Sequence, residues 1–139
     1  MNSQEALQKI GVSAKDMSES DRRALDVNGY FIIPAVLSPE QCSKMAAEVD
    51  RIAGIEGEKA GSEVSQEAGT LRVSNIFNKS AVFDPLLTIK PLLAASHYLL
   101  GEFKVHGSNV REPRKGGGHQ PLHADSVKLA DGGWFKVNS

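Results

Sequence analysis

The segment after Gly101 constrains the fold most strongly, because it indicates short strands separated by tight loops rather than a helix. Its residues alternate in polarity with period two, and a proline and a run of three glycines interrupt them. The pattern predicts strands over 102–111, 119–127 and 134–137, with a hairpin-type loop at 112–118 and a tight turn at 131–133. Consecutive strands joined by such short loops pair antiparallel. We therefore expect an antiparallel sheet in this part of the chain.

Helix signals dominate the residues before Gly101. The strongest is Ser38-Pro39, since serine caps a helix and proline suits its first position. The predicted helices cover 4–10, 18–28, 38–54 and 84–100, the last kinked or divided at Pro91. Two strands are predicted among them, over 30–34 and 70–77, from aromatic and β-branched residues. Helices first and strands later favour an α+β fold.

Two features between these elements allow more than one interpretation. Residues 54–69 are rich in Gly and Glu, which is typical of either a mobile flap over an active site or a plain solvated loop. Cys42 falls in the third predicted helix, where a buried packing thiol is the simplest expectation. A single cysteine forms no internal disulfide, which fits a reducing compartment.

Composition excludes several classes of function. The chain is 40% hydrophobic and 24% charged with a formal charge of −1, which gives no basic surface for nucleic acid or an anionic membrane. No apolar run approaches the length that a membrane helix needs, and the first residues do not resemble a signal peptide. These features predict a cytoplasmic protein with no nucleic-acid or membrane partner. They leave its oligomeric state open.

His123-Ala124-Asp125 is the motif that carries chemistry. On a strand, the imidazole and the carboxylate would lie on one face, because side chains alternate with period two. They are two of the three ligands of the 2-His-1-carboxylate triad that holds non-haem iron. A hydrogen-bonded pair near a strand end is the alternative, and the spacing alone does not decide between them.

Several motifs in order resemble the phytanoyl-CoA dioxygenase family. The N-terminal part of the likeness is Asn28-Gly29-Tyr30-Phe31-Ile32-Ile33-Pro34 followed by Leu37-Ser38-Pro39-Glu40-Gln41-Cys42. The second part is Val110-Arg111-Glu112-Pro113, the three glycines 116–118, and Gln120-Pro121-Leu122-His123-Ala124-Asp125. The closing Gly133-Trp134-Phe135-Lys136-Val137-Asn138 resembles the strand that follows in the family. The resemblance spans about residues 20 to 139.

The resemblance implies a fold, two cofactors and two iron ligands. The expected fold is N-terminal helices plus the first strands of a double-stranded β-helix, or jelly roll. The implied cofactors are Fe(II) and 2-oxoglutarate, with His123 and Asp125 as metal ligands and catalytic residues. The family then brings a distal histidine and a basic residue for the cofactor carboxylate, and no histidine follows His123 here. We therefore expect one incomplete domain over 1–139, with a mainly helical part at 1–60 and the start of the jelly-roll core, including the metal-binding hairpin, at 70–139.

Three further polar residues are candidates for cofactor contact. Arg72 and Arg111 lie on predicted strands and could meet an acidic cofactor, with simple surface charge as the alternative. Gln120 would face the same side as His123 only if a bulge redirected it. The resulting hypothesis is a dioxygenase that hydroxylates an unactivated C–H bond. Its rivals are a jelly-roll binding or structural module that has lost the metal site, and a cupin-type isomerase or hydrolase, which would need a further histidine cluster.

Overall fold

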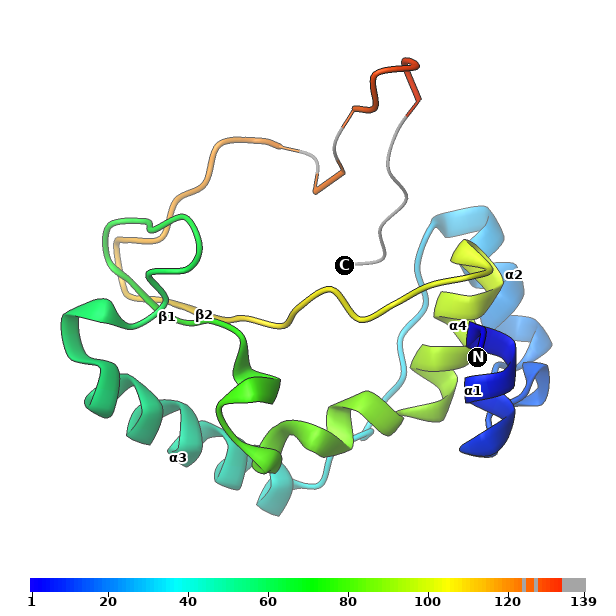
Figure 1. Cartoon of the computed structure of the whole chain (residues 1–139), viewed down its shortest axis with the longest axis horizontal. Helices are drawn as coiled ribbons and strands as arrows, with labels where there is room; N and C mark the ends of the chain where they lie inside the picture. Colours follow the sequence, from blue (N-terminus) through cyan, green and yellow to red (C-terminus); the bar gives the residue numbers. More distant parts are fainter. Residues whose placement is uncertain (124, 127, 134–139) are drawn as a thin grey trace. The chain divides into compact units, whose positions relative to one another are not determined.

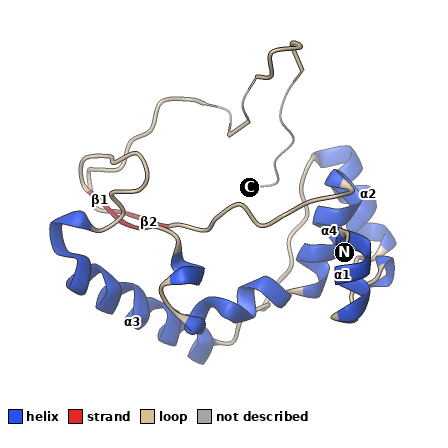
Figure 2. Cartoon of the chain, viewed as in Figure 1, coloured by secondary structure: helices blue, strands red, loops and turns tan. Residues whose placement is uncertain are grey.

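The computed structural model describes residues 1–123, 125–126 and 128–133. These residues form helices and one two-stranded antiparallel sheet, so the fold is α+β as predicted (Figure 2). The elements are α1 Ser3–Lys9, η1 Ala14–Asp16, α2 Glu19–Asn28, α3 Pro39–Glu56, η2 Gly57–Lys59, β1 Thr70–Val73, η3 Ile76–Asn78, η4 Ala81–Thr88, α4 Lys90–Leu100 and β2 Val110–Pro113, where η marks a 3₁₀ helix (Figure 1). The chain divides into two compact units: unit 1, residues 1–36, 88–105 and 123–139, and unit 2, residues 37–87 and 106–122.

Local capping chemistry fixes the helix ends. Ser18 caps α2 by accepting from the Asp21 amide at 3.1 Å, and the helix stops at Gly29, which adopts the left-handed conformation. Ser38 and Gln41 form a reciprocal capping box at the start of α3. The predicted starts of both helices are confirmed.

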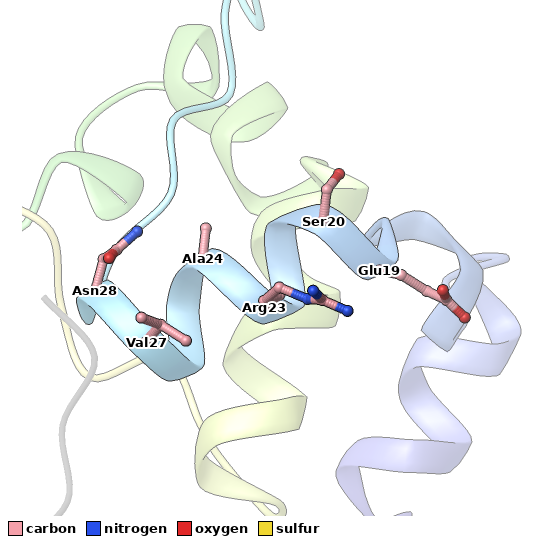
Figure 3. A pocket seen from close by; sticks show the side chains of 6 residues that line it. All are labelled: Glu19, Ser20, Arg23, Ala24, Val27 and Asn28. Atoms are coloured by element: carbon pink, nitrogen blue, oxygen red, sulfur yellow. The ribbon is translucent and has the colours of Figure 1, made fainter.

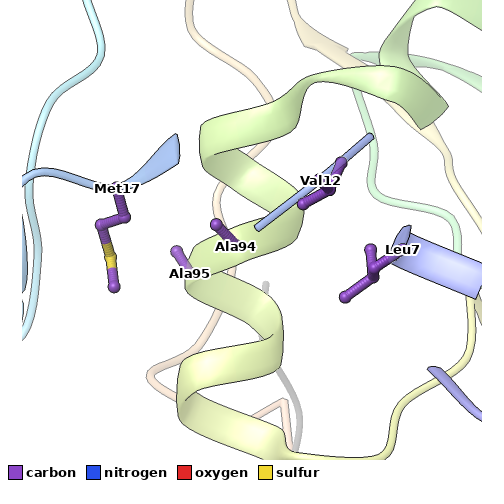
Figure 4. Close-up of a cluster of buried hydrophobic side chains, with 5 residues drawn as sticks. All are labelled: Leu7, Val12, Met17, Ala94 and Ala95. Carbon is purple, nitrogen blue, oxygen red and sulfur yellow. The ribbon is translucent and has the colours of Figure 1, made fainter. Parts of the chain in front are cut away.

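The core of unit 1 joins the N-terminal residues to α4. Five buried side chains form it, as Figure 4 shows: Leu7, Val12, Met17, Ala94 and Ala95. The Ser3 hydroxyl donates to the Phe103 carbonyl at 2.8 Å and accepts from the Phe103 amide at 2.9 Å. The Ser3 amide also donates to the Glu102 carboxylate at 2.8 Å. Hydrogen bonds therefore tie the first helical residue to the segment that follows α4.

The core of unit 2 places α3 beneath the strand pair. Its buried members are Val49, Ile52, Val73, Ile76 and Phe83. Strands β1 and β2 pair antiparallel, with Arg72 opposite Arg111 and Val73 opposite Val110. Because side chains alternate along a strand, Val73 enters the core and Arg72 points to the other face. This register puts two arginines side by side on the face away from the core.

The predicted fourth helix is divided, as its proline indicated. Residues 81–88 form the 3₁₀ helix η4, and a separate helix, α4, begins at Lys90 with Pro91 in its first turn. Proline is compatible with that position because the first-turn amides have no partner within the helix. The boundary between the units lies close to this break, because unit 2 includes residues 81–87 and unit 1 includes Thr88 and α4.

Several predicted strands are absent or shorter. Residues 30–34 form no strand, because Tyr30 and Ile32 are exposed and only Phe31 packs on a core. Of 102–111 only the last two residues join a strand, and 119–127 is not a strand in its described residues. The predicted strand over 70–77 stops at Val73 because Asn75 turns into the left-handed region. The strand predicted over 134–137 lies outside the described residues.

Cys42 is a further correction. It lies in α3 as expected, but its thiol is exposed rather than buried. The earliest α3 residue that packs on the unit 2 core is Met45, so the first helical turn has no cover within that core. None of the described helices has the length and apolar character needed to cross a membrane.

Candidate metal and carboxylate sites

His123 and Asp125 lie close together in unit 1. The imidazole Nε2 is 3.3 Å from the carboxylate Oδ1, and the two side chains are 51% and 57% exposed. The expected origin of this pairing is wrong, because the described residues around the motif adopt a bend rather than a strand. The two side chains nevertheless lie within 3.3 Å of each other.

The donor set of this pair fits an iron ion. An imidazole nitrogen and a carboxylate oxygen, each about 2.1 Å from one ion and at right angles, lie about 3.0 Å apart. The observed 3.3 Å separation is close to that value. Among the described residues no group of three or more His, Cys, Asp or Glu side chains is placed to hold a metal. The described residues thus bring together two side chains that could each donate to one metal ion.

The other three predicted site residues converge in unit 2 on a residue that the sequence did not single out. Arg72 donates two hydrogen bonds to the Glu67 carboxylate, from Nε to Oε2 at 2.8 Å and from Nη2 to Oε1. Gln120 donates its side-chain amide to the same carboxylate, and Arg111 Nε lies 3.6 Å from Oε1. We call these four residues, Glu67, Arg72, Arg111 and Gln120, the Glu67 cluster. The two members of its central ion pair are mostly buried, with Glu67 12% and Arg72 11% exposed.

The cluster strongly favours the ionised carboxylate. The Arg72 hydrogen bonds lower the pKa of Glu67 to about 2, against an opposing effect of burial, and Gln120 and Arg111 contribute further lowering. The same hydrogen bond raises the pKa of the Arg72 guanidinium. Charge-assisted bidentate pairs of this kind are stronger than neutral hydrogen bonds. Glu67 is therefore an anion at any ordinary pH.

Close backbone approaches hold the cluster in place. The Gly118 amide donates to the Ala68 carbonyl at 3.0 Å, and the Arg114 amide donates to Gly69 at 2.8 Å. Gly118 also accepts from the Arg111 guanidinium. The loop residue Gly61 lies so close to Arg72 that a Cβ there would collide with it. Segment 57–69 is thus anchored on the strand pair. The sequence allowed either a mobile flap or a plain solvated loop, and neither interpretation fully describes these contacts.

A pH dependence follows from the lowered pKa of Glu67. A carboxyl whose pKa is 4.5 unfolded and about 2 folded stabilises the fold fully above pH 4.5 and loses that contribution as the pH falls toward 2. We expect the difference in unfolding free energy between wild type and Glu67→Gln to be constant above about pH 5 and to shrink below it. Urea unfolding at a series of pH values measures this. The pKa of Glu48 is also about 2, but its contribution is the same in both proteins and cancels in the difference. A difference that stays constant down to pH 2 would contradict it.

Lys79, a cation that directly follows η3, is not part of the Glu67 cluster. Its Nζ lies 2.6 Å from Glu56 and 3.0 Å from Glu63. Hydrogen bonds to both glutamates raise the pKa of Lys79, although burial acts in the opposite direction. These two ion pairs link Lys79 to α3 and to the loop that follows it, all within unit 2.

Two hollows occur elsewhere, both in unit 1. One lies on a face of α2 alone, where Arg23, Ala24 and Val27 line it without an opposing described element (Figure 3). The other, about 300 Å³, lies between α1, η1, α2 and α4, with Leu7, Met17 and Ala94 on its floor. Neither is lined by the five predicted site residues. The candidate chemistry therefore lies in the His123–Asp125 pair and the Glu67 cluster.

The predicted site residues thus form two groups. His123 and Asp125 belong to unit 1, and Arg72, Arg111 and Gln120 belong to unit 2. Glu67 is the residue that sequence reasoning missed. One glutamate in a Glu-rich loop carries no distinguishing pattern, and its partners lie 5 to 53 positions away. Only the strand register brings them to one carboxylate.

The comparisons with known proteins agree with the motif chemistry. The class that the motif and the family define is the Fe(II)- and 2-oxoglutarate-dependent oxygenases. The family model "Phytanoyl-CoA dioxygenase (PhyH)" matches residues 25–133, and the chain belongs to this family. The match includes all five predicted site residues and Glu67. Comparisons with curated proteins and with solved structures found no match.

Proposed function

We propose that this protein is an Fe(II)- and 2-oxoglutarate-dependent dioxygenase that hydroxylates a small molecule, with His123 and Asp125 as two of its iron ligands. The observation that supports this most directly is the 3.3 Å separation of His123 Nε2 and Asp125 Oδ1, a donor pair suited to one ion. Family membership supports the same chemistry. The family's third ligand, a distal histidine, has no counterpart after Asp125 in this sequence.

The two ligands would perform different tasks. His123 would offer the Nε2 lone pair, which requires the neutral imidazole with its proton on Nδ1. Asp125 would offer one carboxylate oxygen and reduce the net charge at the site. When bound, the iron and 2-oxoglutarate would supply the oxidising chemistry, while the protein orients the substrate and excludes competing reactions.

Arg72, Arg111 and Gln120 are the proposed cofactor-binding residues. 2-Oxoglutarate carries two carboxylates, and the two guanidiniums with an amide offer the donors that a carboxylate accepts. In the structure these donors already hold a carboxylate, that of Glu67. This contact supports their affinity for the functional group that the cofactor would present.

The proposal includes an architecture and a location. We propose that β1, β2 and the 112–118 loop belong to a jelly-roll core, in one domain over 1–139. The antiparallel pairing of β1 with β2 supports this assignment. A cytoplasmic location agrees with Cys42 as a free thiol.

Anaerobic addition of Fe(II) and 2-oxoglutarate tests the proposal. We expect a visible charge-transfer band with the wild-type protein and its loss in His123→Ala, because one of two ligands is removed. The visible absorption spectrum of each protein shows whether the band is present.

His119→Ala is the matched control. His119 is an exposed histidine four positions earlier and outside the motif, so the band should persist in this variant. A wild-type protein without the band would overturn the proposal and favour a non-catalytic module. A band that survives in His123→Ala would remove His123 from the site.

A further inference from the structure

The positive charges of the Glu67 cluster outnumber its single negative charge, and one of its donors is unsatisfied. Two arginines and an amide surround a single Glu67 side chain, so the cluster keeps an excess positive charge. Arg111 Nε is buried without a hydrogen-bond partner and lies 3.6 Å from the nearest Glu67 oxygen. A buried donor left unsatisfied is costly, and the cost is larger for a charged group. The cluster therefore has a hydrogen-bond donor, Arg111 Nε, that Glu67 leaves without a partner.

The strand register explains why an anion is needed there at all. Arg72 and Arg111 are direct partners across β1 and β2. Like charges opposite each other destabilise a strand pair unless an anion lies between them. The two cations belong to the paired strands, whereas Glu67 comes from the loop that precedes β1. The two guanidiniums are thus part of the sheet, whereas the carboxylate that they bind belongs to a loop.

We propose that the Glu67 cluster is a binding site for a carboxylate of an acidic small molecule, which Glu67 occupies as an internal competitor until 2-oxoglutarate displaces it. The inference rests on the proposed function for the identity of the ligand. Displacement exchanges one carboxylate for another on Arg72 and Gln120, and a carboxylate that is not attached to the chain can also approach Arg111 within hydrogen-bonding distance. The Glu67 side chain then turns to solvent, while the backbone hydrogen bonds of Ala68 and Gly69 stay in place.

An internal competitor has a measurable consequence. When only a fraction of the molecules has the site open, the apparent dissociation constant rises by the inverse of that fraction. Removing the Glu67 charge should therefore tighten ligand binding even though it removes a favourable ion pair from the free protein. A purely structural ion pair predicts the opposite, since its loss would weaken the site.

Calorimetric titration of 2-oxoglutarate into the metal-free protein, with a chelator present, tests this. We expect Glu67→Gln to bind roughly tenfold more tightly than wild type or better, a shift set by the fraction of open sites. Adding Arg111→Gln to that variant should abolish the gain. Glu63→Gln is the matched control, because Glu63 lies in the same loop but pairs with Lys79, outside the Glu67 cluster. Its affinity should equal that of wild type.

Unchanged or weaker binding in Glu67→Gln, or an equal gain in Glu63→Gln, would overturn the inference. If Glu67→Gln fails to fold, the wild-type protein supplies the result by nuclear magnetic resonance. There, 2-oxoglutarate should shift the Gln120 side-chain amide and the Arg72 Nε–H signals, and no shift would count against the site. These readouts need no metal and should persist in His123→Ala, so they are independent of the charge-transfer band that tests the proposed function.

Discussion

Phe83→Ala should lower the free energy of unfolding by about 3–5 kcal/mol, the range for truncating a buried phenylalanine. Phe83 is 2% exposed and packs in the core of unit 2 with Val49, Ile52, Val73 and Ile76. The loss has two parts, the transfer free energy of the ring and the cavity left among rigid neighbours. Because Val73 follows Arg72 on β1, the same cavity lies beneath the strand that carries Arg72 of the Glu67 cluster. Urea unfolding measures the effect.

Val82→Ala is the control for this prediction. Val82 precedes Phe83 in η4 but is 36% exposed, so its truncation should change the unfolding free energy by about 0.5 kcal/mol or less. A Phe83→Ala loss below about 1 kcal/mol would show that the unit 2 core does not depend on this ring.

Gly118→Ala should destabilise the protein by about 2–4 kcal/mol, from backbone strain and overpacking together. Gly118 has a φ of +71°, and a Cβ there would overlap the side chain of Pro113 and lie 2.8 Å from Thr70 Oγ1. The variant would also push the Gly118 carbonyl away from the Arg111 guanidinium that donates to it. Thermal and urea unfolding both report the loss.

Gly116→Ala separates the two contributions. Gly116 has nearly the same φ, +78°, but nothing lies within 4 Å of a Cβ at that position. Its alanine variant should therefore show the backbone strain alone, about 1–2 kcal/mol. Equal losses in the two variants would mean that the contact with Pro113 and Thr70 is not important.

The sequence predicted what depends on near neighbours. Ser18, Ser38 and Gly29 act through residues three or four positions away, so the helix ends could be inferred from short motifs. The strands could not, since a strand exists only where a distant segment pairs with it. Val110 pairs with Val73 rather than with the residues after the glycine loop, and residues 30–34 have a strand-like composition but no partner among the described residues.

The candidate site shows the same division. His123 and Asp125 are two positions apart, so they can meet without any distant segment being placed correctly. Arg72, Arg111 and Gln120 were named individually, but their convergence on Glu67 depends on the β1–β2 register and on the packing of the 57–69 loop. Neither has a signature in the order of residues.

The hydrogen bonds between Ser3 and Phe103 also bear on how the chain is made. Unit 1 is discontinuous, and unit 2 lies within it along the chain. During synthesis α1 leaves the ribosome well before α4, and the partners of Ser3 at residues 102 and 103 follow later still. At about 5–20 residues per second, this interval is roughly 5–20 s. For that time Leu7 and Val12 lack the α4 surface that later covers them, so α1 is made before the segments that secure it.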